Sequence, residues 1–180
     1  NLNQTLFIVI SKSGQTIETL SNFLSLRKIK KNAKNIIVVS EKTKNPLYLL
    51  TKKMNWFHVE HKKYIGGRYS VLSEVGIITA ILMGINYKKL RSKIRFYLKN
   101  ENKKFLKESS IKLADLLLKN KYRNLIFLNY IPELEKFLYW SQQLIAESLG
   151  KKGKGFLPLV SNAPKDHHSL LQLYLDGPKD

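Results

Sequence analysis

A regular alternation of apolar and helix-forming segments in the first 60 residues limits the fold more than any other feature. Two continuous apolar runs rich in β-branched residues, TLFIVI (5–10) and NIIVVS (35–40), are typical of strands covered on both faces, and NWFHVE (55–60) is expected to be a third strand. A helical stretch over about 16–31 separates the first two runs. A shorter one, KNPLYLLTKK (44–53), follows the second run and has Pro46 near its first turn. This order predicts an α/β fold with a parallel sheet.

The second part of the chain continues the alternation after a long charged segment. Residues 88–121 are dense in lysine and carry apolar residues at helical spacing, which predicts amphipathic helices. The other elements expected after the first three strands are, in order, a loop at 61–70, an apolar helix over 71–84, a strand at 124–130, a helix opened by Pro132 and ending near Leu149, a strand at 156–160 and a helix over 165–175. The charged segment is the expected boundary between a domain over residues 1–95 and a domain over residues 96–180.

The composition is that of a globular protein and limits the classes of partner. Hydrophobic residues make up 43% of the sequence, enough to build a core. No apolar run approaches the roughly 20 residues of a membrane-spanning helix, so we expect no membrane partner. The chain has no cysteine, which fits a reducing compartment, and we expect a cytoplasmic protein.

The formal net charge of +19 raises the alternative of a nucleic-acid-binding protein. The 32 basic residues are 27 lysines and 5 arginines, and the lysines are scattered over every segment. Specific readout of bases and phosphates favours arginine gathered on one face. The pattern therefore favours a biased surface composition over a specific nucleic-acid partner, although a positive field would still attract a phosphorylated substrate.

The stretch SKSGQTIET, residues 11–19, directly follows the first apolar run. A strand that ends in hydroxyl residues and then opens a helix presents N–H groups and hydroxyls at the positive end of that helix. Such a turn would bind phosphate through Ser11, Ser13 and Thr16, with Gly14 allowing close approach of the backbone. The alternative is an ordinary helix cap by Ser13 or Thr16, and the sequence leaves both open.

Two glycines precede Arg68 in IGGRYSVLSEVG, residues 65–76, just after the third apolar run. The glycines permit a tight backbone path, and Arg68 would project from the end of the sheet where open α/β proteins bind ligands. A guanidinium there would stabilise a developing oxyanion. The alternative is a surface arginine beside a glycine turn.

Glu147 lies near the end of a largely apolar helix in YWSQQLIAESLGKKGKG, residues 139–155. A carboxylate in the apolar company of Trp140 and Leu144 is a candidate general base with a tuned pKa. The alternative is an exposed glutamate near the end of the helix, and spacing alone favours that alternative.

Two adjacent histidines occur in DHHSLLQLYLDGP, residues 166–178. His167 and His168 point in different directions on a helix, and the chain has only four histidines and no cysteine, so we expect no metal site. One histidine would act as a general acid. The alternative for this stretch is helix capping by Asp166.

Four stretches in this order resemble the glucose-6-phosphate isomerase family, also called phosphoglucose isomerase: SKSGQTIET, GGRYSVLSEVG, QQLIAESLGKKGKG and HSLLQLYLDGP. The resemblance covers the chain apart from residues 88–121. It implies an α/β fold of two sugar-isomerase (SIS) domains, each a parallel sheet flanked by helices. Residues 1–95 would be the later part of the first SIS domain. Residues 96–180 would be the linking helices and the early part of the second.

The resemblance also implies an activity and a substrate site. Members of the family interconvert glucose 6-phosphate and fructose 6-phosphate through an enediolate, a step of glycolysis and gluconeogenesis, with no metal or other cofactor. By the resemblance, the phosphate of the sugar would be held by Ser11, Ser13 and Thr16, with Lys12 nearby.

The catalytic roles implied by the resemblance fall on three residues. Arg68 would stabilise the enediolate, and Glu147 would move a proton between C2 and C1 of the sugar. His168 would assist ring opening and, in a homodimer, would reach the site of the neighbouring subunit. His167 stands where the family often has glutamine and receives no role.

The resemblance also implies that the chain is an internal part of a longer enzyme. A Gly-Ser segment that touches the sugar would precede Asn1, and a catalytic lysine would follow Asp180, so we expect the 180 residues alone to be inactive. A non-catalytic SIS module that binds sugar phosphates is the alternative, and it would need neither Glu147 nor Arg68. Whether mannose 6-phosphate is also a substrate stays open.

Overall fold

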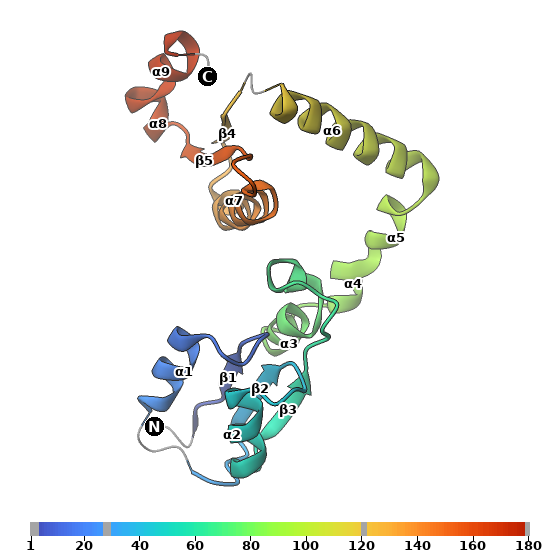
Figure 1. Cartoon of the computed structure of the whole chain (residues 1–180), viewed down its shortest axis with the longest axis vertical. Coiled ribbons are helices and arrows are strands. Elements are labelled where there is room, and N and C mark those ends of the chain that lie inside the picture. The colour runs from blue at the N-terminus through green and yellow to red at the C-terminus, as the bar shows by residue number, and fades with distance from the viewer. Residues whose placement is uncertain (1–3, 27–29, 120–121, 179–180) are drawn as a thin grey trace. The chain divides into compact units, whose positions relative to one another are not determined.

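The computed structural model describes residues 4–26, 30–119 and 122–178 of the chain (Figure 1). The chain divides into two compact units, Asn1–Ser92 and Lys93–Asp180. The charged segment expected to mark a boundary contains this division. The assignment of residues 1–95 and 96–180 to parts of two SIS domains stays a prediction.

The first unit is built on a parallel sheet of three strands in the order β1–β2–β3. The strands are β1 (Phe7–Ile10), β2 (Ile36–Ser40) and β3 (Phe57–Glu60), and they lie within the three predicted runs. Phe7 pairs with Ile36, and Ile37 pairs with Phe57, so all three strands end at the same edge of the sheet. The predicted α/β class with parallel strands is confirmed.

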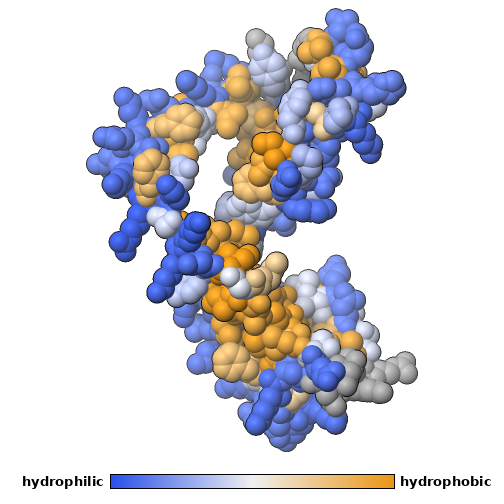
Figure 2. Space-filling view, turned by 180° about the vertical axis from the view of Figure 1, so that it is seen from behind, coloured by the Kyte–Doolittle hydropathy of each residue, from blue (hydrophilic) through white to orange (hydrophobic). Residues whose placement is uncertain are grey.

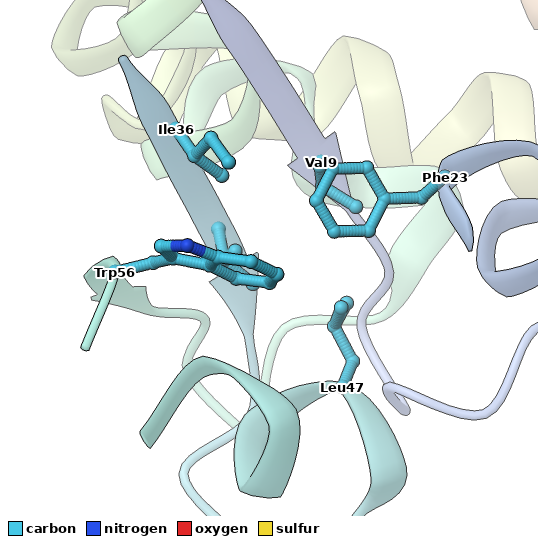
Figure 3. Close-up of a cluster of buried hydrophobic side chains, with 6 residues drawn as sticks. Val9, Phe23, Ile36, Leu47 and Trp56 are labelled. Atoms are coloured by element: carbon cyan, nitrogen blue, oxygen red, sulfur yellow. The ribbon is translucent and has the colours of Figure 1, made fainter. Parts of the chain in front are cut away.

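Helices α1 (Ile17–Leu24) and α2 (Pro46–Met54) connect these strands and cover one face of the sheet. Pro46 is the first residue of α2, where its missing N–H costs nothing, as the sequence predicted. The buried cluster between sheet and helices joins Val9, Ile36 and Val38 of the strands to Phe23 of α1, Leu47 of α2 and Trp56 (Figure 3). Phe23 and Trp56 meet edge to face, with ring centroids 5.3 Å apart.

The segment after β3 differs from the predicted apolar helix over 71–84. Residues Gly67–Leu72 form a 3₁₀ helix, η2, and α3 begins only at Glu74 and ends at Leu82. The hydroxyl of Ser70 donates to Gly67 O at 2.6 Å, and that of Ser73 donates to Ser70 O at 2.7 Å. These short-range bonds satisfy carbonyls with a three-residue spacing and favour the tighter helix. Helix α4 (Tyr87–Ser92) completes the unit.

The second unit contains a two-stranded parallel sheet of β4 (Asn124–Asn129) and β5 (Leu157–Asn162), paired from Asn124 with Leu157 to Asn129 with Asn162. Its helices are α5 (Ile94–Tyr97), α6 (Asn100–Leu118), the 3₁₀ helix η3 (Pro132–Leu134), α7 (Glu135–Leu149), α8 (Lys165–Ser169) and α9 (Leu171–Asp176). The predicted single helix over 165–175 is wrong in detail. It is divided at Leu170, whose φ of −126° interrupts the helical path.

Large apolar side chains remain at the surface of both units. Figure 2 shows such side chains gathered on one face of the unit Asn1–Ser92. In that unit they include Ile81, Leu82 and Met83 at the end of α3, and in the other unit Phe105 and Leu118 of α6. Exposed apolar surface on this scale marks faces that bind something else.

Candidate phosphate-binding loop and catalytic residues

The common carboxyl edge of the β1–β2–β3 sheet carries a row of polar residues. Ser11, Ser40 and His61 each follow or end one strand, and all three are buried. Ser11 N donates to Val39 O at 3.0 Å, and His61 N donates to Ser40 O at 2.9 Å, so the backbone ladder continues into this row. In open α/β sheets this is the edge that binds ligands.

The loop between β1 and α1 brings two of its three hydroxyl side chains into contact. Ser11 Oγ and Thr16 Oγ1 are hydrogen-bonded at 2.9 Å, and Ser13 Oγ accepts from Gln15 N at 3.3 Å. Thr16 occupies the N-cap position of α1, yet its side chain makes no cap hydrogen bond. The first N–H groups of α1 are therefore not capped by the Thr16 hydroxyl, and a helix start in that state attracts an anion.

Gly14 has a φ of +64°, a conformation that favours glycine, and its N–H donates to Ser11 O at 3.1 Å. Lys12 Nζ lies 3.7 Å from the carboxylate of Glu41 in the next loop. The turn therefore carries three hydroxyl side chains within six residues, and the charge of Lys12 beside them is partly offset by Glu41.

Arg68 lies in η2, which follows β3 and therefore starts from the same edge of the sheet as the loop of residues 11–16. Its Cζ lies 5.1 Å from the centre of the Tyr69 ring, a cation–π contact. The tight glycine path expected before it is seen only at Gly66. This residue has an extended conformation that any residue adopts, but a Cβ on it would lie 3.0 Å from the Tyr69 ring, whereas a Cβ on Gly67 would meet nothing within 4 Å.

Glu147 lies in the second unit, on the exposed face of α7. Its Oε1 accepts a hydrogen bond from Gln143 Nε2 at 2.7 Å, one helical turn earlier. The apolar, buried surroundings considered for this carboxylate are absent from the described part of the unit. The reason is helical periodicity, because Gln142 faces β5 and donates to Pro158 O at 2.7 Å, whereas Gln143 and Glu147 share the outer face.

The histidine pair lies on α8 in the same unit. His167 is hydrogen-bonded through Nε2 to Tyr130 Oη at 2.8 Å, whereas His168 is exposed. Asp166 does not cap the helix, because Pro164 holds the N-cap position. Its Oδ2 instead accepts from Asn162 N at 2.7 Å and from Ser161 Oγ at 3.1 Å, which ties α8 to the end of β5.

The structure thus brings Ser11, Lys12, Ser13 and Thr16 together in one loop and places Arg68 after the same sheet edge. Glu147 and His168 belong to the other unit. Sequence reasoning missed three polar residues of the first unit: Asn45, His58 and His61. Asn45 and His61 are each 1% exposed. The dipeptide Asn45-Pro46 was the available signal for the first of these, because it marks a helix start.

The ring of His58 forms a hydrogen bond with Ser40, the last residue of β2. Its Nε2 lies 3.0 Å from Ser40 Oγ, and its ring packs against Tyr48 at a centroid distance of 4.8 Å. Burial lowers the pKa of His58 below its ordinary value of 6.5, and this effect outweighs a hydrogen bond to the backbone of Ser40 and the nearby Glu60 carboxylate, which raise the pKa.

No group of three or more histidine or acidic side chains with metal-binding spacing occurs in residues 4–26, 30–119 and 122–178. Over the same ranges, none of the helices has both the length and the apolarity required to cross a bilayer.

A sequence profile of one family, described as "Phosphoglucose isomerase", matches residues 1–155. The chain belongs to the phosphoglucose isomerase family. The match takes in the loop of residues 11–16, Arg68 and Glu147, and it ends before His168.

Curated relatives and solved structures agree with this membership. A protein of Methanococcus maripaludis named "Probable glucose-6-phosphate isomerase" is 39% identical over all of this chain, which spans 43% of that protein. A "Glucose-6-phosphate isomerase" of Methanocaldococcus jannaschii is 33% identical, and the chain spans 46% of it. The chain therefore spans less than half the length of these family members.

Two solved structures share the fold. A hypothetical protein from Thermus thermophilus superposes with a TM-score of 0.79 at 28% identity, covering 97% of this chain and 45% of the other. A glucose-6-phosphate isomerase from Chlamydia trachomatis superposes with a TM-score of 0.76 at 23% identity, covering 99% of this chain and 38% of the other. The second likeness shows the fold of the phosphoglucose isomerase family and no more.

Proposed function

We propose that the protein to which this chain belongs interconverts glucose 6-phosphate and fructose 6-phosphate. Membership of the phosphoglucose isomerase family supports this, and so do the names of the relatives from Methanococcus and Methanocaldococcus. The structural observation that carries the proposal is the loop of residues 11–16, in which the hydroxyls of Ser11 and Thr16 meet beside a helix start that the Thr16 side chain leaves uncapped.

The phosphate of the sugar is the proposed occupant of this loop. Ser11, Ser13 and Thr16 offer hydroxyls, the first turn of α1 offers N–H groups, and Lys12 offers a charge. Because the phosphate does not react, its binding serves to hold C1 and C2 of the sugar in place, so binding free energy gained at the phosphate lowers the barrier at the reacting carbons.

The reaction moves one proton between neighbouring carbons. In open-chain glucose 6-phosphate the Glu147 carboxylate takes the proton from C2, the electron pair forms a C1–C2 double bond, and the C1 oxygen takes the negative charge. Arg68 stabilises that charge. Return of the proton from Glu147 to C1, with transfer of the hydroxyl proton from O2 to the C1 oxygen, gives the C1 hydroxyl and the ketone at C2 of fructose 6-phosphate. His168 assists opening of the sugar ring, in which the ring oxygen gains a proton and the C1 hydroxyl beside it loses one.

The proposal extends to the setting of the enzyme. It acts in glycolysis and gluconeogenesis in the cytoplasm, as a homodimer in which His168 serves the neighbouring subunit. Its substrate is a sugar phosphate, and the excess of lysine is a property of the surface with no specific nucleic-acid partner.

Replacement of Glu147 tests the catalytic part of the proposal in the complete gene product. Glu147→Gln keeps the shape and the bond to Gln143 but removes the base, so we expect kcat to fall at least about a hundredfold, while a sugar-acid phosphate that mimics the enediolate still binds. Glu108→Gln, on the exposed surface of α6, is the matched control and should leave kcat unchanged.

Two outcomes would count against the proposal. Full activity of Glu147→Gln would show that another group removes the proton. An unmodified protein that binds fructose 6-phosphate but never converts it would support the non-catalytic sugar-phosphate-binding module instead.

A further inference from the structure

We infer that Asn45 is a positioning residue for the phosphate-binding loop of residues 11–16, which it reaches through Gly14. The inference rests on the proposed function, because it assumes that this loop holds the phosphate of the substrate. Asn45 would not touch the substrate itself. It would fix the shape of the loop that does.

Asn45 is 1% exposed and uses its whole side-chain amide. Its Oδ1 accepts from Tyr48 N at 2.8 Å, which caps α2. Its Nδ2 donates to Glu41 O at 2.9 Å and to Thr43 Oγ1 at 3.1 Å. A cap alone needs only the oxygen. The two donated bonds fold residues 41–45 into one shape, so Asn45 organises the whole loop between β2 and α2.

The loop between β2 and α2 contacts the phosphate-binding loop of residues 11–16 at three places. Glu41 N donates to Lys12 O at 2.9 Å, and Leu47 N donates to Gly14 O at 3.1 Å. The carboxylate of Glu41 lies 3.7 Å from Lys12 Nζ. Residues 12 and 14 of the phosphate-binding loop therefore take their positions from residues 41 and 47, on either side of Asn45.

Gly14 is packed directly against the Asn45 amide. A Cβ built on Gly14 would overlap the side chain of Asn45, so the glycine is required here for space as well as for its φ of +64°. The turn of residues 11–14 thus packs against the Asn45 amide. Without this contact the turn can move away from the geometry in which the hydroxyls of Ser11 and Thr16 are hydrogen-bonded.

The arrangement predicts a distinction between helix capping and loop positioning. Serine at position 45 would still cap α2, but its short side chain would not reach Glu41 O and would leave the Gly14 contact empty. Alanine would lose both functions. A pure capping role therefore predicts that serine restores everything, and a positioning role predicts that serine restores stability alone.

The test compares variants of the complete gene product by thermal unfolding, by KM and kcat for fructose 6-phosphate, and by inhibition with inorganic phosphate. We expect Asn45→Ala to lower Tm and to raise both KM and the inhibition constant for phosphate about five- to tenfold, the effect of one lost hydrogen bond or slightly more. We expect Asn45→Ser to regain most of the Tm and to keep the raised KM. In both variants kcat should change less than KM.

Two reference variants make the result unambiguous. Asn55→Ala acts at the far end of α2, where Asn55 has a φ of 54°, and should lower Tm without changing KM. The double variant Ser13→Ala/Thr16→Ala removes two proposed phosphate contacts and should raise KM and the phosphate inhibition constant.

The outcomes separate the inference from the function on which it rests. If the Ser13/Thr16 variant raises KM but Asn45→Ala and Asn45→Ser do not, Asn45 is a structural cap and the inference is wrong. Recovery of both Tm and KM in Asn45→Ser leads to the same conclusion. If the Ser13/Thr16 variant itself binds as the unmodified protein does, the loop is not the phosphate site, and the proposed role of the loop falls together with the inference.

Discussion

Replacement of Gly14 by alanine is expected to destabilise the protein through two separable causes. The first is conformational, since the φ of +64° costs an alanine roughly 1–2 kcal/mol. The second is steric, since the new Cβ would overlap the buried Asn45 amide, and overpacking of this kind costs about 1–3 kcal/mol. Gly14→Ala should therefore lower the free energy of unfolding by about 2–5 kcal/mol, a large part of the roughly 5–15 kcal/mol typical of a native protein.

A second glycine isolates the conformational cause. Gly84 has a φ of +73°, but a Cβ built on it would meet nothing within 4 Å. Gly84→Ala should thus show the conformational cost alone. Urea unfolding of the two alanine variants would give the steric cost as the difference between them.

The double variant Gly14→Ala/Asn45→Ala tests whether the steric cause has been correctly located. Removal of the amide makes room for the new methyl group, so the two changes should be less harmful together than their sum by about 1–3 kcal/mol. Additivity within about 0.5 kcal/mol, or equal effects of Gly14→Ala and Gly84→Ala, would refute the contact between Gly14 and Asn45 as the reason for the glycine.

Two further predictions concern pH and charge. Because burial lowers the pKa of His58, the unfolded chain takes up a proton below about pH 6.5 before the folded protein does, so the free energy of unfolding should fall as the pH drops through that value. The measurement is urea unfolding at about pH 7.5 and about pH 5.5, and His58→Gln should reduce the difference between them. If the net charge of +19 is a surface bias, duplex DNA should bind without sequence preference and with a Kd on the order of 10⁻⁴ to 10⁻⁶ M at physiological salt. Tight, sequence-selective binding in a filter or anisotropy assay would contradict this.

The sequence predicted the first sheet well because its strands satisfy a strong local rule. TLFIVI and NIIVVS are apolar through their central positions, as strands covered on both faces must be, and Pro46 marks the start of the helix between β2 and β3. The boundaries of α3 and of the last helices were harder to predict. Apolar residues occur on a 3₁₀ helix as well as on an α-helix, so the apolar pattern did not separate η2 from α3. No glycine or proline in the sequence marks the break at Leu170 between α8 and α9.

The sequence predicted which residues form the phosphate-binding loop better than it predicted the environment of Glu147. Ser11, Ser13 and Thr16 are neighbours in the sequence, so their gathering in one loop follows from the strand-to-helix turn. Whether Glu147 is buried depends on which face of α7 packs against β5. The apolar residues near Glu147 in the sequence do not determine which face that is. Gln142 faces the sheet and Gln143 faces outward with Glu147, a difference of one residue in a helix with about 3.6 residues per turn.

Asn45 shows why a satisfactory local explanation can hide a longer-range one. An asparagine before a proline is fully explained as a helix cap, and the bond from Tyr48 N agrees. Gly14 is likewise explained as a turn residue by its own φ. Neither explanation accounts for the contact between the two residues, which are far apart in the sequence. The Asn45 amide lies where a Cβ on residue 14 would be, and only the lack of a side chain on Gly14 leaves room for it. Several residue types could serve as the turn residue at position 14, and several could cap the helix at position 45. Because the two loops meet, the residue at position 14 must be small enough to leave room for the amide at position 45. The carboxyl edge of a parallel sheet is where such joint requirements arise, because successive βα loops are brought side by side there regardless of their separation in the sequence.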